Sequence, residues 1–228
     1  MKVTAIIVAA GLGKRMGENI PKQYLDINGK PLIYYTLHKI AFCSKINDII
    51  LVVAEDKIHY CLKEIIEKYR IPKIKEIIAG GEKRQDSVYH GLKKVDLDTE
   101  IVLIHDGVRP LVDSHLLEKI ILKTIEKDAT VIGKPISDTI VRRDDLNYIK
   151  KILNRKNVYA LETPQCFKYG LIMQAYQKAY QENYYETDDT SLVVRMGRKV
   201  AIIESDKINI KVTHPKDLYM AEYLLSKD

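Results

Sequence analysis

Cationic side chains surround a glycine-bearing loop near the start of the chain. The loop reads Ala9-Ala10-Gly11-Leu12-Gly13-Lys14-Arg15-Met16, it directly follows an apolar run, and Lys22 comes soon after it in Pro21-Lys22-Gln23. Small residues let a ligand approach the backbone closely, and Arg15 and Lys22 can reach the same space. A strand that leads into such a loop is typical of a polyphosphate-binding site.

The glycine spacing differs from that of two common nucleotide-binding loops. Gly11, Gly13 and Gly17 form G-x-G-x-x-x-G rather than the dinucleotide pattern G-x-G-x-x-G, and Gly13-Lys14 precedes Arg15 rather than the Ser or Thr of a Walker loop. On the glycines alone, a plain strand-to-helix turn with solvated charges is an equal alternative. Residues further along the chain favour the phosphate loop.

Further polar segments stand where apolar runs end. Taken singly, each has a structural explanation as a turn, a strand end, a helix cap or a surface lysine. Together they predict a base-and-ribose pocket beside the first loop, because the carboxyl ends of parallel strands meet at one edge of a sheet. In one of them Arg109, held rigid by Pro110, suits a substrate phosphate. The segments are Gly80-Gly81-Glu82-Lys83-Arg84-Gln85-Asp86-Ser87, His105-Asp106-Gly107-Val108-Arg109-Pro110, Thr187-Asp188-Asp189-Thr190 and Asn209-Ile210-Lys211-Val212-Thr213.

Strand and helix patterns alternate along the chain. Runs rich in Ile and Val that are apolar on both faces, as buried parallel strands are, occupy residues 4–10, 49–54, 74–79 and 101–105. The alternation predicts an α/β fold, a doubly wound and mostly parallel sheet that is Rossmann-like, with ligands beyond the strands' carboxyl ends. Helical patterns cover residues 31–42, 57–69, 87–95, 114–127, 169–181, 188–196 and 215–225, with one more strand pattern at 199–204.

The alternation is interrupted between residues 136 and 165. Residues 139–143, 148–153 and 157–161 read as short extended pieces around an Asp144-Asp145 turn. This pattern predicts a projecting antiparallel β-arm that belongs to a single domain of residues 1–228.

Composition narrows the function classes. The 228 residues include three cysteines, with no disulfide framework, zinc spacing or nucleophile motif evident, and carry a net charge of +6 that is spread along the chain. No apolar run is long enough to span a bilayer, and the first residues carry no targeting pattern. We therefore expect a cytoplasmic protein that binds a small polyanion, with no membrane and no nucleic acid as partner.

Seven ordered motifs, spread from about residue 4 to residue 225, resemble those of one enzyme family. They closely resemble the 2-C-methyl-D-erythritol 4-phosphate cytidylyltransferases of the non-mevalonate isoprenoid pathway, which have a nucleotidyltransferase fold. The motifs are Ala9-Ala10-Gly11-x-Gly13-x-Arg15-Met16, Pro21-Lys22-Gln23-Tyr24, Gly80-Gly81-x-x-Arg84-x-x-Ser87-Val88, His105-Asp106-x-x-Arg109-Pro110, Thr163-Pro164-Gln165, Thr187-Asp188-Asp189 and Asn209-Ile210-Lys211-Val212-Thr213.

The resemblance implies attack of the substrate's 4-phosphate on the α-phosphorus of CTP, with release of pyrophosphate. It implies Mg²⁺ or another divalent cation, held mainly by the CTP phosphates rather than by protein ligands. It also implies a homodimer in which Thr139 and Arg155 reach from the arm into the partner's site.

The same resemblance assigns roles to the residues. Arg15, Lys22 and Lys211 are implied as the catalytic cations. Arg109, Thr139, Arg155, Thr187 and Lys211 are implied as ligands of the sugar-alcohol phosphate. The implied CTP-binding residues are Ala9, Ala10, Gly11, Gly13, Gly81, Glu82, Ser87 and Asp106.

Three alternatives remain open at this point. Asn154-Arg155-Lys156 is closer to the related D-ribitol 5-phosphate cytidylyltransferases, whereas Tyr24 and the segment that starts at Thr187 favour the isoprenoid enzymes. A dinucleotide-dependent oxidoreductase would share the first strand and loop but not the glycine spacing. A nucleic-acid-binding module would share the charge but not a recognition motif.

Overall fold

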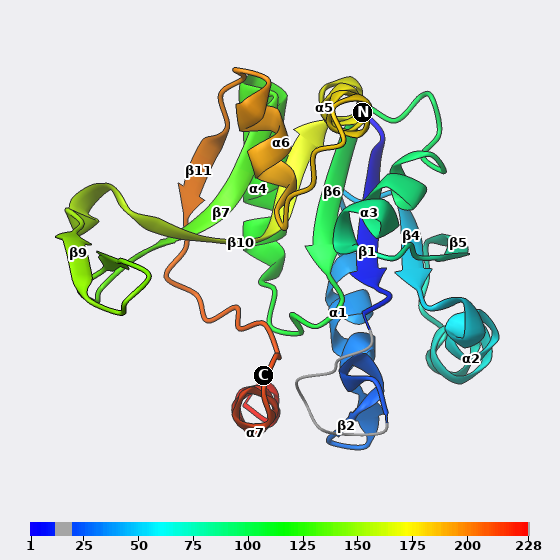
Figure 1. Ribbon diagram of the computed structural model, residues 1–228. Coiled ribbons are helices and arrows are strands. Elements are labelled where there is room, and N and C mark those ends of the chain that lie inside the picture. The colour runs from blue at the N-terminus through cyan, green and yellow to red at the C-terminus, as the bar shows by residue number, and fades with distance from the viewer. Residues whose placement is uncertain (12–19, 228) are drawn as a thin grey trace.

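The computed structural model describes residues 1–11 and 20–227. At its centre is a seven-stranded sheet with the order β11-β7-β10-β6-β1-β4-β5 (Figure 1). β10 runs antiparallel to both of its neighbours, and the other pairings in this sheet are parallel. The mostly parallel sheet that the sequence predicts is therefore confirmed. Its strands are β1 (Val3–Ala9), β4 (Asp48–Val53), β5 (Ile74–Ala79), β6 (Ile101–Asp106), β7 (Ala129–Pro135), β10 (Tyr159–Lys168) and β11 (Ala201–Glu204).

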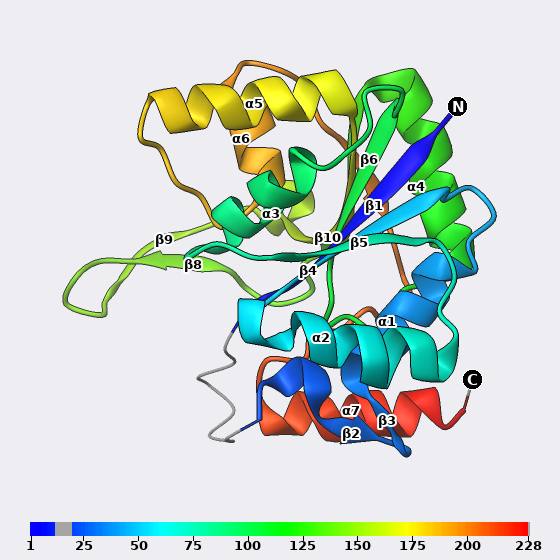
Figure 2. The same cartoon turned by 90° about the vertical axis from the view of Figure 1, so that its right-hand side faces the viewer.

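Helices cover both faces of this sheet. Figure 2 shows α3, α5 and α6 on one face and α1, α2 and α4 on the other. The helices are α1 (Leu32–Ala41), α2 (Ile58–Tyr60) with its π-helical continuation η4 (Cys61–Glu67), α3 (Arg84–Leu92), α4 (Ser114–Lys127), α5 (Tyr169–Gln181), α6 (Asp189–Arg195) and α7 (Pro215–Leu225). Short 3-10 turns are η2 (Lys22–Tyr24), η3 (Glu55–Lys57) and η5 (Arg155–Asn157).

Two hydrophobic cores follow from this layering. Alternate residues of β1 enter opposite cores, so that Ile7 packs with α1 and α4 while Ile6 packs with α3 and α5. Strands covered on both faces need apolar residues at successive positions, which explains the continuous Ile and Val runs in the sequence. The two cores fix the sheet from which the candidate site is built.

The strand register brings four strand ends to the same level. Val8 of β1 pairs with Asp106 of β6, Ala9 pairs with Val53 of β4, and Val53 pairs with Ala79 of β5. Ala10 and Gly11 after β1, the Gly80-Gly81 turn after β5 and the carboxylate of Asp106 are therefore neighbours, as the sequence predicts.

The predicted arm is present, but the sequence reading of its flanks needs two corrections. β8 (Val141–Arg143) and β9 (Ile149–Ile152) pair antiparallel, and the Asp144 carboxylate caps the turn between them. The third piece is not a separate strand of the arm, because it is the start of β10, which continues into the central sheet. The sequence reading also missed β7, the strand that pairs with β10 at the base of the arm.

The chain after β11 returns to the site edge of the sheet. Val212 donates its backbone N–H to the carbonyl of Val108 at 3.0 Å, which ties the segment of Lys211 to the loop after β6. α7 then packs on the small hairpin of β2 (Asp26–Ile27) and β3 (Lys30–Pro31), over a third cluster that includes Leu32 and Ala221 (Figure 2).

Candidate active site

A cavity of about 790 Å³ lies beyond the carboxyl ends of β1, β4, β5 and β6. Crevices at this edge of a doubly wound sheet are the usual ligand sites of such folds. The structure thus brings together most of the residues predicted to bind CTP and two of the predicted cations. The predicted residues that line the cavity are Ala9, Ala10, Gly11, Lys22, Gly81, Glu82, Ser87, Asp106 and Lys211. The predicted Gly13 and Arg15 lie outside the described residues.

Gln23 anchors the segment that carries Lys22. Its buried side-chain amide donates to the backbone carbonyls of Ala9 at 2.7 Å and Gly11 at 3.0 Å. The neighbouring Tyr24 is also buried, and its hydroxyl lies 3.4 Å from the Cys61 sulfur. Lys22 is thus set at the cavity wall by two buried neighbours in η2, a function of Gln23 that the sequence reading did not assign.

The Gly80-Gly81 turn forms the opposite wall. A Cβ on Gly80 would stand 2.3 Å from Ala10 Cβ and 2.8 Å from Ser87 Oγ, so only glycine permits this approach of the two loops. The Ser87 hydroxyl accepts from Gly81 N at 3.1 Å and donates to the Lys83 carbonyl at 3.2 Å. Ser87 therefore also stabilises the turn. α3 begins at Arg84, three residues before the predicted start at Ser87.

Asp106 is the electrostatic centre of the cavity. Its buried carboxylate contacts Lys211 Nζ at 2.7 Å and Arg84 Nε at 3.2 Å, and Arg109 Nε lies 3.7 Å away. Burial by itself would raise the pKa of Asp106, but Arg84 and Lys211 outweigh it and hold the pKa far below the ordinary range. The carboxylate is therefore charged and fixes Lys211 at the cavity wall.

Arg84 joins the cavity to the start of α6. Its guanidinium donates two hydrogen bonds to the Asp189 carboxylate, at 3.0 and 2.8 Å, in addition to the contact with Asp106. Tyr176 donates a further hydrogen bond to Asp189. The sequence analysis placed Arg84 in a motif but assigned it no role. Arg84 and Asp189 are 105 residues apart in the chain, so no local sequence pattern indicates that they pair.

Arg109 lies next to Asp106 but is not among the residues that line the cavity. It is buried, and its guanidinium donates to the backbone carbonyl of Asn209 at 2.6 Å. The Asn209 amide in turn donates to Glu162 Oε2 at 2.9 Å and to the Thr163 carbonyl at 2.8 Å. This network supports the backbone two residues before Lys211.

The other predicted ligands of the sugar phosphate lie apart from the cavity of their own chain. Thr139 and Arg155 are exposed on the arm, where Arg155 donates to the Ser137 carbonyl. Thr187 is exposed in the segment before α6, and the next residue, Asp188, caps that helix, which begins at Asp189, one residue after the predicted start. None of the three lines the cavity described above.

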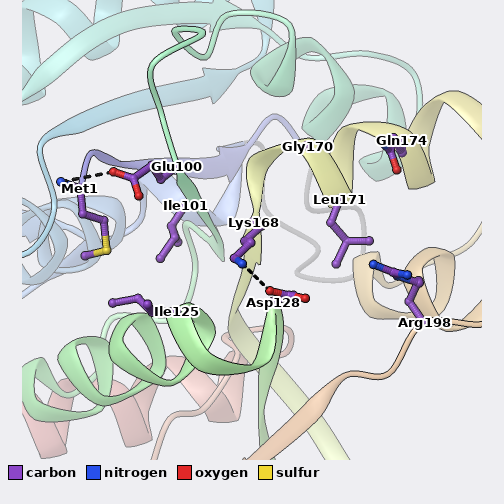
Figure 3. Close-up of a pocket in the computed structure, with 10 residues that line it drawn as sticks. All are labelled: Met1, Glu100, Ile101, Ile125, Asp128, Lys168, Gly170, Leu171, Gln174 and Arg198. Carbon is purple, nitrogen blue, oxygen red and sulfur yellow. Dashed lines mark ion pairs between the residues drawn. The ribbon is translucent and has the colours of Figure 1, made fainter.

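A second cavity, of about 460 Å³, lies at the opposite end of the sheet (Figure 3). Four of its charged groups form two ion pairs, the N-terminal amine with Glu100 at 3.2 Å and Lys168 with Asp128 at 2.6 Å, and Arg198 also lines it. None of the predicted site residues lines it. The chemistry therefore belongs to the first cavity.

Among residues 1–11 and 20–227, no group of three or more His, Cys, Asp or Glu side chains is arranged to hold a metal ion. Within the same ranges, no helix has the length and apolar character needed to cross a bilayer.

Comparison with known proteins identifies the family. The family described as "IspD: 2-C-methyl-D-erythritol 4-phosphate cytidylyltransferase" matches residues 3–227. The chain belongs to this family. Proteins named 2-C-methyl-D-erythritol 4-phosphate cytidylyltransferase from Clostridium botulinum and Caldanaerobacter subterraneus are each 43% identical to it, covering 99% and 100% of this chain and 98% and 100% of the relatives.

Solved structures of the family share the fold. A 4-diphosphocytidyl-2C-methyl-D-erythritol synthase from Anaerococcus prevotii superposes with a TM-score of 0.87 at 33% identity, covering 99% of this chain and 96% of that one. The Thermus thermophilus 2-C-methyl-D-erythritol 4-phosphate cytidylyltransferase gives a TM-score of 0.80 at 28% identity, covering 99% and 100%. The family membership confirms the resemblance on which the sequence prediction rests.

Proposed function

We propose that this chain transfers the cytidylyl group of CTP to 2-C-methyl-D-erythritol 4-phosphate. An oxygen of the 4-phosphate forms a bond to the α-phosphorus of CTP, and the bond from that phosphorus to the β-phosphate oxygen breaks. The products are 4-diphosphocytidyl-2-C-methyl-D-erythritol and pyrophosphate. The observation that carries the proposal, together with family membership, is the cavity in which Lys22 and Lys211 face a glycine-walled pocket.

Charge neutralisation is the main catalytic task in this proposal. A phosphate monoester that attacks a triphosphate brings two anions together, and the α-phosphorus gains negative charge at its five-coordinate stage. Lys22 and Lys211 line the cavity from opposite ends of the chain, and Asp106 holds Lys211 at 2.7 Å. Cations that are already in position stabilise this developing charge, because they need not move during the reaction. Arg15, outside the described residues, is proposed to join them.

The cytidine is proposed to bind between the two glycine turns. Ala9, Ala10 and Gly11 form one wall, and Gly81, Glu82 and Ser87 form the other, with Asp106 at the base. These small residues let a flat base approach the backbone closely. Backbone groups of the turn that hydrogen-bond the cytosine edge would be left unpaired by another base, which is the physical source of selectivity for CTP.

A divalent cation, Mg²⁺ or another, is proposed to enter with CTP. Mg²⁺ is usually bound by one or two carboxylates together with substrate phosphates. The cavity offers the buried carboxylate of Asp106 and the exposed ones of Glu55 and Glu82, which form no metal-binding cluster among the described residues. This donor set fits an ion held chiefly by the triphosphate, whose charge it would neutralise.

The arm is proposed to complete the site of a second copy of this chain. Its two strands expose Val141, Ile149 and Ile152, and the turn between them exposes Leu146 and Tyr148, with fractions from 41% to 78%. A surface of this kind is typical of an association interface. Thr139 and Arg155 do not line the cavity of their own chain. In a homodimer formed through the arm, they would lie beside the acceptor phosphate in the partner's site, together with Arg109 and Thr187.

The reaction is tested by a paired assay of acceptors. With CTP and Mg²⁺, we expect pyrophosphate release on addition of 2-C-methyl-D-erythritol 4-phosphate and much less on addition of D-ribitol 5-phosphate at the same concentration. Pyrophosphate release with D-ribitol 5-phosphate but not with the erythritol phosphate would mean that the reaction is correct and the proposed acceptor is wrong. Release with neither would reject the proposal.

The shared site is tested by mixing two variants that are each nearly inactive at a concentration of sugar phosphate well below the KM. Arg155→Ala is expected to raise the KM for the sugar phosphate with little change in CTP binding, and Lys211→Ala to lower kcat by roughly 10²- to 10³-fold. In a heterodimer of the two, one site has both native residues, so random exchange of subunits should restore roughly a quarter of the activity. Absence of recovery after unfolding and refolding the mixture would show that each chain uses its own arm or none.

A further inference from the structure

Three consecutive residues at the start of α3 hold the segment 184–189, which leads into α6. Lys83 Nζ lies 3.7 Å from the centre of the Tyr185 ring, Arg84 pairs with the Asp189 carboxylate, and Gln85 bonds the backbone of residues 184 and 186. These residues directly follow Gly81 and Glu82, which line the proposed nucleotide pocket. The nucleotide turn and the segment that carries Thr187 are thus joined by side chains.

Gln85 makes the most specific of these contacts. Its side-chain amide donates to the Tyr184 carbonyl at 3.0 Å and accepts from Glu186 N at 2.8 Å, and the residue is only 2% exposed. A carboxamide carries a donor and an acceptor on one planar group, so it can pair with this stretch of backbone as a neighbouring strand would. Residues 184 and 186 lie outside the helices and strands, so Gln85 supplies the hydrogen-bond partners that their backbone groups need.

Thr187 lies between two fixed points of this segment. On one side Gln85 holds residues 184 and 186, and on the other Gln165 donates to the Asp188 carboxylate at 2.5 Å. Thr187 itself is exposed and stands outside the regular elements. Its position therefore depends on side chains from other elements rather than on a helix or strand of its own.

We propose that Gln85 is a positioning residue for the acceptor, which it serves by holding the segment 184–189 so that Thr187 faces the sugar phosphate. The inference rests on the proposed function, because that function assigns Thr187 to the acceptor. Gln85 belongs by sequence to the nucleotide-binding turn but does not line the cavity. Its loss should therefore affect the acceptor rather than CTP.

The test is a comparison of Michaelis constants in the full-length protein. Gln85→Met keeps the length of the side chain and removes both hydrogen bonds, so we expect the KM for 2-C-methyl-D-erythritol 4-phosphate to rise on the order of tenfold. The KM for CTP should stay within about twofold, because the pocket walls are unchanged. A general loss of structure would raise both constants or lower the amount of active enzyme.

Two further variants keep the test interpretable. Tyr180→Phe removes the 2.6 Å hydrogen bond to Asp86 in the same turn without touching the backbone of 184–189, and should leave both KM values unchanged. Tyr185→Ala removes an exposed ring from the segment itself, so it should fold even if Gln85→Met does not. We expect it to raise the acceptor KM alone by roughly two- to fivefold, the value of an exposed cation–π contact.

Thr187→Val separates failure of the inference from failure of the proposed role. If Thr187→Val raises the acceptor KM and the Gln85→Met and Tyr185→Ala variants do not, the positioning role of Gln85 is rejected and the proposed function stands. If Gln85→Met raises the KM for CTP as much as that for the acceptor, Gln85 serves the nucleotide turn, which also overturns the inference. If Thr187→Val leaves the acceptor KM unchanged, both the role of Thr187 and the inference fail.

Discussion

Replacing Lys22 or Lys211 by alanine is expected to lower kcat by roughly 10²- to 10³-fold, the usual cost of removing one preorganised donor that stabilises transition-state charge. The KM for CTP should change much less, because each cation is proposed to act most strongly on the charge that develops at the α-phosphorus. Pyrophosphate release under saturating CTP and acceptor measures the effect.

The fold should survive both substitutions. Lys22 stands beside Gln23 and Tyr24, whose own buried contacts anchor η2. Loss of Lys211 leaves Asp106 with Arg84 and Arg109 as counter-charges. Thermal unfolding of the variants should therefore stay close to that of the native protein.

A lysine outside the cavity provides the control. Lys216 is exposed in the first turn of α7, five residues after Lys211, and does not line the cavity. Lys216→Ala changes the net charge by the same amount and should leave kcat unchanged. If Lys22→Ala and Lys211→Ala also keep native turnover, the cations are not the catalysts and the site assignment is wrong.

The sequence predicted the elements with strong local signals. α4, α5 and α7 have the predicted bounds, because Asp113 caps the first of these helices and Pro215 opens the last. The carboxyl ends of four parallel strands were placed to within one residue because apolar residues dominate their runs. From those ends, the cavity walls at Ala9, Gly81 and Asp106 could be anticipated.

β7 and β10 lacked such signals. β10 contains Pro164, and polar residues such as Thr163 and Gln165 that are buried in the structure, so its pattern reads as a loop. Its pairing with β7 also shifts register between Glu162 and Gln165. These breaks conceal a strand that runs from the arm into the sheet.

Long-range side-chain pairs were also invisible to sequence reasoning. Arg84 with Asp189, and Gln85 with the backbone of residues 184 and 186, join segments about a hundred residues apart. Hydrophobic periodicity indicates which face of a helix or strand is buried. It does not indicate which distant residue a polar side chain will contact. Only the packing of α3 against α5 and α6 places these groups together.

Asp106→Asn is expected to lower both the stability of the protein and its catalytic rate. The substitution preserves shape but removes the negative charge that faces Arg84, Arg109 and Lys211. Arg84 keeps the Asp189 carboxylate and Lys211 is partly exposed, so the loss of the buried Asp106 charge should lower the free energy of unfolding by roughly 1 to 3 kcal/mol at pH 7. Lys211 also loses the partner that fixes it, and misplacement of a catalytic group by about 1 Å can cost on the order of 10²-fold in rate.

The pH dependence of stability identifies the charge as the cause. The folded-state pKa of Asp106 lies below the unfolded value of about 3.9, so its contribution is complete above that value and is lost as the pH falls toward the folded pKa. The difference in unfolding free energy between the native protein and Asp106→Asn should thus be constant from about pH 7 to 5 and shrink below about pH 4. Urea unfolding at several pH values measures it.

A control substitution at an exposed carboxylate distinguishes the loss of the Asp106 charge from a general change in net charge. Asp98 lies 3.1 Å from Lys2 Nζ with 72% of its side chain exposed, and Asp98→Asn alters net charge as Asp106→Asn does. Exposed pairs contribute little to stability, so its unfolding curve should match that of the native protein at each pH. Equal stability of Asp106→Asn and the native protein at pH 7, or a difference that persists unchanged into acid, would mean that Arg84, Arg109 and Lys211 do not depend on the Asp106 charge. Lys211 would then have to be held by its backbone alone, through the Val212 to Val108 hydrogen bond and the Asn209 network.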